Sequence, residues 1–332
     1  MVLLLGSTGL LGGNVLRILV SRGEEVLAPV RNPAALERVR KEIPGAKIIA
    51  PAARIDRLAE LLPLCRKFKP DAIINCAGTT DMSTPSLEGF LEMNYRLCTL
   101  LPTLMKECGI RRLVHTSSAN TIRSGSALQA SDESAPFEGI YTRSFYAQSK
   151  KMGEDVLLSF SRRHDELHII ILNPGFMIGP YDNKPSSGKL LLAGYRKPLM
   201  AAPSGAKNFV HVRDAAAAAV NALQMGRNGG RYLITGELIK LRDFYRLQAK
   251  TMGYRQLCIT LPDALVRLAG CFGDLLRKTG VRTMLGSVNC AQLLLEEHYD
   301  NSAAVRELLL PHSPIEVAIR EFFVTSDCVR KN

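Results

Sequence analysis

A glycine-rich turn near the start of the chain most constrains its fold. Val2–Leu5 is a short apolar run typical of a buried β-strand, and Leu10–Arg22 has the apolar spacing of a helix. Between them the sequence reads Gly6-Ser7-Thr8-Gly9-Leu10-Leu11-Gly12. A strand, a tight glycine turn and a helix in this order let the backbone approach a pyrophosphate, which the free N–H groups of the helix N-terminus then bind. A glycine turn that holds no ligand is the alternative interpretation.

The first half of the chain repeats this alternation of strands and helices. Further strands are predicted at Val26–Val30, Lys47–Ala50, Ala72–Asn75, Arg112–Thr116 and His168–Leu172, and helices at Ala34–Lys41, Ile55–Phe68, Leu87–Cys108 and Tyr146–His164. The pattern predicts an α/β fold with a Rossmann-type doubly wound parallel sheet. We expect a dinucleotide-binding domain over residues 1–175, to which 208–236 returns, and a smaller C-terminal substrate lobe formed by 176–207 and 237–332.

Composition excludes several other classes of protein. Of the 332 residues 46% are hydrophobic and 22% are charged, which is ordinary for a globular protein. Apolar runs are short and no secretory signal is recognised, so a cytoplasmic location is expected. Eight cysteines form no CxxC pair, and no metal site is predicted. The net charge of +12 is spread along the chain, which favours an anionic cofactor or substrate over nucleic acid.

One tyrosine–lysine pair stands out as a candidate acid–base group. Among nine tyrosines, only Tyr146 has a lysine, Lys150, four residues downstream. On a helix this spacing places both side chains on one face. A nearby cation favours the phenolate and is therefore expected to lower the tyrosine pKa from about 10. Such a tyrosine can exchange a proton with a substrate oxygen. The alternative is an ordinary helical pair on the surface.

Two predicted strands end in residues suited to line a ligand site. One is followed by Cys76-Ala77-Gly78, whose small residues let the backbone pass close to a nicotinamide ribose, and the other ends in His115-Thr116-Ser117-Ser118. Ligands bind at the carboxyl ends of strands in such sheets. Ser118 and Tyr146 can therefore converge and hydrogen-bond the same substrate oxygen. For His115, a place in the core is favoured over a catalytic role.

The residue after the second strand bears on the choice of dinucleotide. Chains that select NAD usually carry an acidic residue there, which bonds the ribose 2′-hydroxyl. This chain carries Arg31, which can hold a 2′-phosphate, and Arg38 lies two helical turns further on and can assist. NADP(H) is therefore favoured, with NAD as the alternative. A solvated surface charge is the other interpretation of Arg31.

The motifs GSTGLLG, NCAG, HTSSA and YAQSK occur in the order and spacing of a known family. Together they resemble the extended short-chain dehydrogenase/reductases, especially bacterial dihydroflavonol-4-reductase-like members of the NAD-dependent epimerase/dehydratase group. The resemblance implies that Tyr146 is the proton donor, that Lys150 tunes its pKa and binds the ribose, and that Ser118 polarises the carbonyl. It also implies a catalytic role for Asn94, which matches a mid-helix asparagine of the family.

The resemblance extends to the nicotinamide side of the cofactor. Asn173-Pro174-Gly175 looks like the family segment that lies along the nicotinamide. The family's usual acid at the end of the third strand aligns with Ala53, so Asp56 is not expected to meet the adenine. The predicted cofactor-binding residues are Gly6, Thr8, Gly9, Leu10, Leu11, Gly12, Arg31, Arg38, Ala77, Gly78, Thr116, Lys150, Asn173, Pro174 and Gly175.

These residues imply an oxidoreductase that reduces a ketone or aldehyde, or oxidises the alcohol, with Tyr146 as general acid or base. Three alternatives remain open: a nucleotide-sugar epimerase or dehydratase with retained NAD, a 3β-hydroxysteroid dehydrogenase-like enzyme, and a non-catalytic NADP-sensing protein. In the family, the helices corresponding to Leu87–Cys108 and Tyr146–His164 pair across a dimer axis, so a homodimer is expected.

An apolar stripe near the C-terminal end of the chain has two interpretations. It consists of Leu261, Leu265, Leu268, Phe272, Leu275 and Leu276, with charged residues off the stripe. This spacing predicts an amphipathic helix. The favoured interpretation is a helix packed over the substrate cleft. The alternative is contact of residues 261–278 with a membrane surface, which would serve an apolar substrate.

Overall fold

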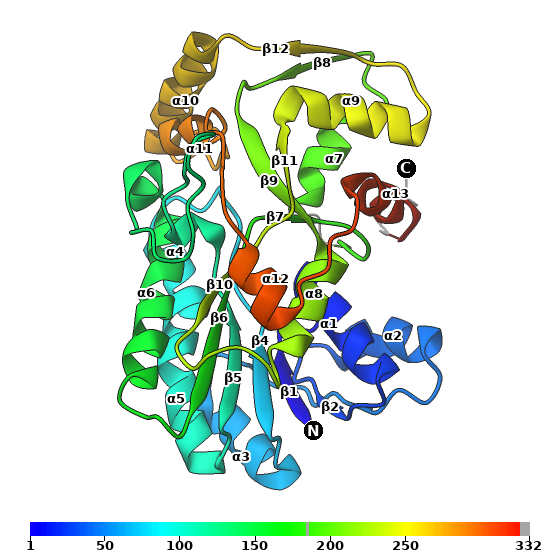
Figure 1. Ribbon diagram of the computed structural model, residues 1–332, viewed down its shortest axis with the longest axis vertical. Helices are drawn as coiled ribbons and strands as arrows, with labels where there is room; N and C mark the ends of the chain where they lie inside the picture. The colour runs from blue at the N-terminus through cyan, green and yellow to red at the C-terminus, as the bar shows by residue number, and fades with distance from the viewer. Residues whose placement is uncertain (184–185, 326–332) are drawn as a thin grey trace.

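A parallel sheet forms the centre of the molecule in the computed structural model, which describes residues 1–183 and 186–325 (Figure 1). Its strands are β1 (Val2–Leu5), β2 (Val26–Leu27), β3 (Ile48–Ile49), β4 (Ala72–Asn75), β5 (Arg112–Thr116), β6 (His168–Pro174) and β10 (Arg231–Ile234). These runs are rich in Val, Ile and Leu and are buried along most of their length, as expected of strands covered on both faces.

The order of the strands determines where a ligand can bind. It is β10-β6-β5-β4-β1-β2-β3, and each neighbouring pair is parallel. The chain moves outward from β1 to β3 and then returns across the sheet to β4. Connections therefore leave β1 and β4 in opposite directions, and a crevice forms at their carboxyl ends. This arrangement confirms the predicted doubly wound α/β fold.

Helices cover both faces of the central sheet, with one hydrophobic core on each side (Figure 1). One face carries α1 (Leu10–Ser21), α8 (Val212–Asn221) and α12 (Ser302–Leu308). The other carries α3 (Leu58–Phe68), α5 (Leu97–Cys108) and α6 (Phe145–Ser161). Side chains alternate along β1, so that Leu4 enters the first core while Leu3 and Leu5 enter the second. The short helix α2 (Glu37–Glu42) lies between β2 and β3 in the chain.

The predicted helix over Leu87–Cys108 is not uniform. It consists of α4 (Glu88–Leu91), a π-helical segment over Glu92–Arg96 and then α5. Insertions of this kind occur often at functional sites, because the wider turn reorients a side chain. Here the π segment contains Asn94, which is completely buried.

A smaller lobe lies beyond the carboxyl ends of the central strands. In its three-stranded sheet, β9 (Ala206–His211) lies between β7 (Phe176–Ile178) and β11 (Glu237–Lys240), and in a second sheet β8 (Leu199–Ala202) pairs with β12 (Leu257–Thr260). Its helices are α7 (Gly188–Gly194), α9 (Leu241–Met252), α10 (Asp263–Lys278), α11 (Ser287–Gln292) and α13 (Ile315–Thr325). Most of these elements surround a third hydrophobic core, whereas α10 packs against α11.

Only part of the 208–236 segment returns to the dinucleotide domain. Helix α8 joins the core beside α1, and β10 extends the central sheet next to β6. Strand β9 instead pairs with β7 and β11 in the smaller lobe, which corrects the sequence prediction. The reason is that the chain continues past β6 as β7, which offers β9 an unpaired edge outside the central sheet.

Two short connections join the central sheet to the smaller one. Gly175 alone separates β6 from β7, and Thr235 and Gly236 separate β10 from β11. A Cβ atom at Gly175 would lie 2.5 Å from the Asn208 carbonyl oxygen, and one at Gly236 would lie 2.5 Å from the Phe209 carbonyl oxygen. Both glycines therefore let a strand pass close to β9 as it enters the second sheet.

The packing of helix α10 differs from the one that the sequence favoured. Its apolar stripe does not pack over a cleft, because Leu265, Leu268, Phe272 and Leu275 are all more than half exposed. The buried face of α10 is made by Val266, Gly270 and Gly273 instead. Among the described residues, no helix combines the length and apolar character needed to cross a bilayer.

Candidate active site

The predicted phosphate-binding turn has the geometry that a pyrophosphate needs. Gly6 has a φ of +81°, and a Cβ atom there would lie 2.7 Å from the Ala77 amide nitrogen. A Cβ atom at Gly12 would lie 2.1 Å from the Gly6 carbonyl oxygen. Neither position accepts a side chain without movement of the backbone. The turn therefore stays tightly closed against β4.

The N-terminus of α1 is available to an anion. Gly9 is its N-cap, no side chain caps the first turn, and the first turn contains no acidic residue. Thr8 and Gly9 are exposed, whereas Leu11 is buried and can offer only its backbone N–H. Free N–H groups and the positive end of the helix dipole favour a phosphate at such a site. These residues fit a dinucleotide.

Lys150 lies at the carboxyl ends of β4 and β5. Its ammonium group donates a hydrogen bond to the Thr116 carbonyl oxygen at 3.0 Å, and the residue is 3% exposed. A Cβ atom at Gly78 would lie 2.8 Å from Lys150 Nζ and 3.0 Å from Asn94 Oδ1. The missing side chain at Gly78 therefore leaves the space that the lysine occupies. The structure brings Lys150, Thr116 and Gly78 together, as the sequence predicts.

Tyr146 begins the same helix one turn earlier and reaches Ser118. The Ser118 side chain lies close enough to lower the pKa of Tyr146 by hydrogen bonding. The Tyr146 ring also packs edge-on against Phe90 of α4, with ring centroids 6.1 Å apart. Ser144 caps α6 by accepting a hydrogen bond from the Ala147 amide, which fixes where the helix begins. The predicted convergence of Tyr146 and Ser118 is therefore present.

The predicted direction of the Tyr146 pKa shift is wrong for the protein without a ligand. Burial raises the pKa of Tyr146 above its ordinary value, and the hydrogen bond with Ser118 opposes this shift. Because the residue is only half-buried, water moderates the effect. Burial also lowers the pKa of Lys150. The ammonium of Lys150 is hydrogen-bonded to the Thr116 carbonyl, so it does not stabilise a phenolate at Tyr146 here.

Asn94 holds the loop after β4 against α6. Its Oδ1 accepts a hydrogen bond from the Thr79 amide at 2.8 Å, and its Nδ2 donates to the Thr79 carbonyl and to Ser149 Oγ, each at 3.0 Å. At Gly153 a Cβ atom would lie 2.2 Å from the Asn94 carbonyl oxygen, so α6 passes very close to the π segment. In this arrangement Asn94 positions the neighbours of Tyr146 and Lys150, and both N–H groups of its amide are already used.

Sequence reasoning missed a buried carboxylate behind the site. Glu154 is completely buried on α6, and its Oε2 accepts hydrogen bonds from Thr121 Oγ1 at 3.0 Å and Asn173 Nδ2 at 2.9 Å. Its Oε1 lies 2.7 Å from Arg231 Nε on β10. The signal was in the sequence, since Glu154 lies four residues beyond Lys150 on the same helix face.

Asn173 belongs to this network through the Nδ2 group of its amide. Its Nδ2 also donates to the Ser118 carbonyl oxygen at 3.2 Å, and the residue is completely buried. Asn173 therefore supports the backbone of Ser118 from behind. Pro174 ends β6 and Gly175 follows it at the start of the smaller lobe. A role for Asn173, Pro174 and Gly175 in cofactor binding stays a prediction.

The two predicted 2′-phosphate ligands differ in their surroundings. Arg31 is exposed just beyond the bridge between Val30 and Ala52, and no hydrogen bond or ion pair engages it among the described residues. Arg38 pairs with Glu42 at 2.8 Å and donates to the Thr325 carbonyl oxygen at 3.1 Å. Arg31 is therefore free to meet a ligand, whereas an assisting role for Arg38 would require these contacts to break.

His115 lies in the core, as the sequence favours. His115 is completely buried, and its Nδ1 lies 3.1 Å from Asn75 Nδ2. Burial, with a smaller contribution from the nearby Lys150 charge, lowers the pKa of His115 well below its ordinary value. A neutral histidine beneath Lys150 adds no positive charge to the site. Asp56 forms an ion pair with Arg54.

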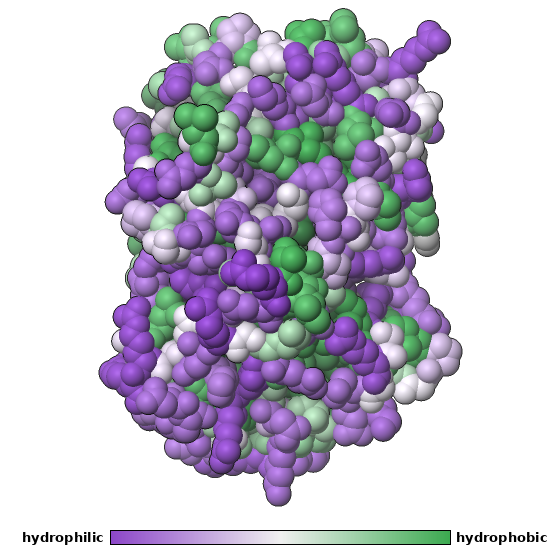
Figure 2. Space-filling view, viewed as in Figure 1, coloured by the Kyte–Doolittle hydropathy of each residue, from purple (hydrophilic) through white to green (hydrophobic). Residues whose placement is uncertain are grey.

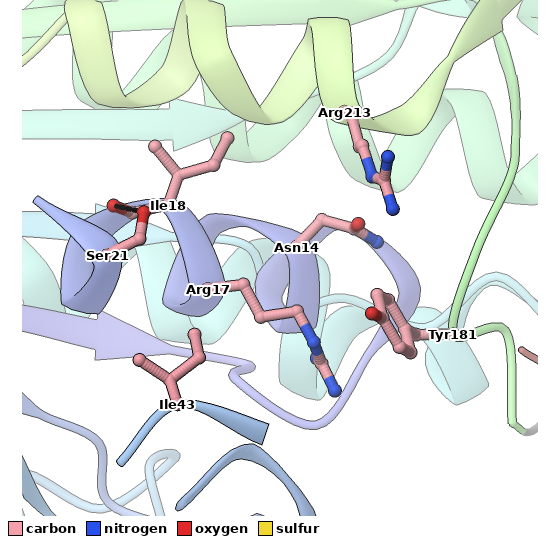
Figure 3. A pocket seen from close by; sticks show the side chains of 7 residues that line it. All are labelled: Asn14, Arg17, Ile18, Ser21, Ile43, Tyr181 and Arg213. Carbon is pink, nitrogen blue, oxygen red and sulfur yellow. Dashed lines mark hydrogen bonds between the residues drawn. The ribbon is translucent and has the colours of Figure 1, made fainter. Parts of the chain in front are cut away.

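A separate cavity of about 220 Å³ lies along the outer side of α1 (Figure 3). It is lined by Asn14, Arg17, Ile18, Ser21, Ile43, Tyr181 and Arg213. Arg17 stacks on Tyr181, with its guanidinium carbon 3.5 Å from the ring centroid, and also pairs with Glu42 at 2.7 Å. Arg213 pairs with Glu321 at 2.6 Å. Arg17 shares the Glu42 carboxylate with Arg38, and no predicted catalytic residue lines the cavity.

The doubly wound sheet, the glycine turn and the Tyr146–Lys150 pair together define a dinucleotide-binding protein of the short-chain dehydrogenase/reductase class. More narrowly, the chain belongs to the NAD dependent epimerase/dehydratase family, whose model matches residues 2–235. Members of this family are NAD(P)-dependent oxidoreductases, epimerases and dehydratases. The match covers the glycine turn, both strand ends and the Tyr146–Lys150 helix.

Individual relatives are similar at a lower level. Sterol demethylase protein B of Methylococcus capsulatus is 28% identical over 280 residues, covering 80% of this chain and 78% of its own. A Synechocystis protein, provisionally named dihydroflavonol 4-reductase, is 27% identical over 324 residues, covering 95% of this chain and 91% of its own. The crystal structure of gox2253 superposes with a TM-score of 0.80 at 23% identity, covering 98% of this chain and 97% of its own, and shows the shared fold.

Proposed function

We propose that the protein is an NADP(H)-dependent oxidoreductase that interconverts a ketone or aldehyde with the corresponding alcohol. The observation that carries this proposal is the convergence of Tyr146, Ser118 and Lys150 at the carboxyl ends of β4 and β5, beside the glycine turn. A bound dihydronicotinamide would supply the hydride to the carbonyl carbon. The residues of the chain then have only to hold the substrate oxygen and deliver one proton to it.

Tyr146 delivers that proton and Ser118 holds the oxygen that receives it. The two hydroxyl groups lie close together, so a carbonyl oxygen placed between them would accept a hydrogen bond from each. In reduction the Tyr146 hydroxyl gives its proton to the substrate oxygen, and in oxidation the phenolate takes it back. The raised pKa keeps the phenol protonated at neutral pH, which suits the reducing direction.

Lys150 completes the site in this proposal by binding the cofactor ribose. An ammonium group has three N–H donors, and one of them is used by the Thr116 carbonyl. The other two are available to ribose hydroxyls next to Gly78, where no side chain intervenes. A cationic nicotinamide beside Tyr146 would also favour the phenolate, which the protein alone does not.

Tyr146→Phe tests the catalytic step. Removal of the hydroxyl should lower turnover about 10²- to 10⁴-fold while NADPH binding, measured by fluorescence, stays unchanged. Tyr181→Phe is the matched control, because it removes the same atom from the cavity beside α1. The substrate would come from a panel of carbonyls, hydroxysteroids and nucleotide sugars followed by NADPH absorbance. Full activity of Tyr146→Phe would refute the mechanism.

The preference for NADP(H) over NAD is supported by the exposed, unpaired guanidinium of Arg31. Arg31→Asp should reverse the NADP/NAD ratio of kcat/KM by at least about tenfold, since it replaces a phosphate ligand with a repelling charge. The control is Arg22→Asp, which makes the same charge change at the C-terminal end of α1, opposite to the glycine turn. An unaltered ratio in Arg31→Asp would contradict the assignment.

An epimerase or dehydratase is the second candidate, supported by the name of the family itself. The same residues would then oxidise and re-reduce one substrate on retained dinucleotide. Purified protein that carries stoichiometric, non-exchanging NAD would favour this candidate, whereas freely exchanging NADPH would favour a reductase. The similarity to a protein named for sterol demethylation supports apolar hydroxysteroids as one class in the substrate panel.

A further inference from the structure

Ten exposed apolar side chains lie at the end of the molecule farthest from the central sheet, and we call them the distal apolar surface. Four form the stripe on α10: Leu265 is 54% exposed, Leu268 65%, Phe272 58% and Leu275 58%. The other six are Val281, Met284 and Leu285, which follow α10, and Leu199, Leu257 and Ile259 on the β8–β12 ribbon. Monomeric proteins rarely expose large apolar side chains in such a group without a partner.

The exposure of α10 is fixed by how the helix packs. Its inner face contains Gly270 and Gly273, which lie directly against the segment leading into α11. A Cβ atom at Gly273 would lie 2.1 Å from the Leu285 carbonyl oxygen, and one at Gly270 would lie 2.9 Å from Ser287 Cα. Rotating the helix to bury its leucines would place large side chains where even a methyl group does not fit. The apolar stripe is therefore held outward.

The ribbon lies at the same end of the molecule as the helix. Figure 1 shows β12 running directly into α10 along the top of the smaller lobe, with β8 beside β12. In Figure 2, hydrophobic residues reach the surface along this end. Helix and ribbon therefore form one apolar region at this end of the smaller lobe.

Positive charge surrounds this region. Its exposed basic residues are Arg196, Lys197, Arg255, Arg267, Lys278 and Arg282. The two acidic residues of α10 are engaged, because Asp263 accepts a hydrogen bond from Ser204 and Asp274 accepts one from the Ser287 amide. An outward apolar stripe edged with lysine and arginine is the pattern of a helix that lies in the plane of a membrane interface.

We propose that the distal apolar surface binds the surface of an anionic lipid bilayer, with α10 and the β8–β12 ribbon inserted at the level of the headgroups. The basic edge then meets lipid phosphates while the leucines and Phe272 enter the acyl boundary. A second copy of the chain fits this surface less well, because two such faces would bring their basic edges together. The proposal does not depend on catalysis.

Vesicle binding of the full chain tests the proposal. Co-flotation with phosphatidylglycerol-containing vesicles should exceed that with pure phosphatidylcholine vesicles and should weaken as salt screens the basic edge. The double variant Leu268→Asp, Phe272→Asp should lower the bound fraction at least about tenfold. Val305→Asp, which adds the same charge at an exposed apolar site on α12, should bind as the wild type does. Because all three positions are exposed, the thermal midpoint Tm should not change.

Three results would overturn the proposal. The first is no binding of the wild type to either kind of vesicle. The second is equal binding by the wild type and the Leu268→Asp, Phe272→Asp variant. The third is a lipid-free dimer, seen by sedimentation, that this variant abolishes, since the surface would then be occupied by a second copy of the chain.

Discussion

Substitution of Gly12 by alanine offers the sharpest test of the phosphate-binding turn. The added Cβ atom would lie 2.1 Å from the Gly6 carbonyl oxygen and 2.7 Å from the Gly6 carbonyl carbon. Both neighbours are backbone atoms, so the conflict cannot be relieved by rotating a side chain. Ordinary contact distances require the turn and α1 to separate by about 1 Å.

The expected effect is larger on ligand binding than on folding. Such overpacking costs about 1–3 kcal/mol of unfolding free energy. Displacing the phosphate-binding N–H groups by about 1 Å should weaken NADPH binding about 10²-fold, or about 2.7 kcal/mol. Calorimetric titration with NADPH measures the affinity, and thermal unfolding measures the stability.

Gly13→Ala is the matched control on the same helix. A Cβ atom there would meet its nearest neighbours, Arg17 and Ser7, at 3.6 Å, which is ordinary contact. Alanine inside a helix is favoured over glycine by about 0.5–1 kcal/mol. Gly13→Ala should therefore bind NADPH normally and unfold at a higher temperature. Wild-type affinity in Gly12→Ala, or an equal loss in Gly13→Ala, would refute the proposed role of the turn.

Two further predictions concern the groups behind and within the site. Glu154→Gln should lower the unfolding free energy by about 3–5 kcal/mol, because it leaves the partly buried Arg231 without its carboxylate. Denaturant unfolding measures this loss, which should be smaller in the double variant that also carries Arg231→Met. If the losses of the two single variants simply add in the double variant, the two residues are not paired. The phenol of Tyr146 should ionise with a pKa above the ordinary value near 10 when no ligand is bound. The difference between the ultraviolet titrations of the wild type and Tyr146→Phe measures this pKa. The contribution of the phenol to stability is then complete below about pH 10 and falls as pH rises further, because the unfolded phenol ionises first. A midpoint below the ordinary value would show that Lys150 lowers the pKa without any cofactor.

Sequence reasoning succeeded where local pattern decides the structure. The glycine turn, the strand ends and the Tyr146–Lys150 spacing each depend on neighbouring residues, so their placement could be predicted before the fold was known. The direction of the Tyr146 pKa could not, because it depends on how deeply α6 is buried and on the hydrogen bond between Lys150 and Thr116. Glu154 was missed for a similar reason, since its partners come from β6, β10 and the segment after β5.

The packing of α10 and β9 also could not be predicted from a sequence pattern. An apolar stripe indicates an amphipathic helix but does not say which face packs, and on α10 the small residues Gly270 and Gly273 took the inner position. Strand β9 had the composition of a buried strand, yet its sheet was decided by β7, which lies about thirty residues earlier in the chain. Both outcomes depend on tertiary partners.

The paired crossings at Gly175 and at Thr235–Gly236 should hold the two lobes together so that they move as one body. At both crossings a strand of the central sheet continues into the smaller sheet, and β9 lies between the two incoming strands. A protease cut in one connection would leave the other intact, so the halves should not separate after a single cleavage. Grafting the substrate lobe of a relative onto this nucleotide domain would therefore need a splice at each of these glycines, and also between β9 and α8 and on both sides of α12, where the chain enters or leaves the first core.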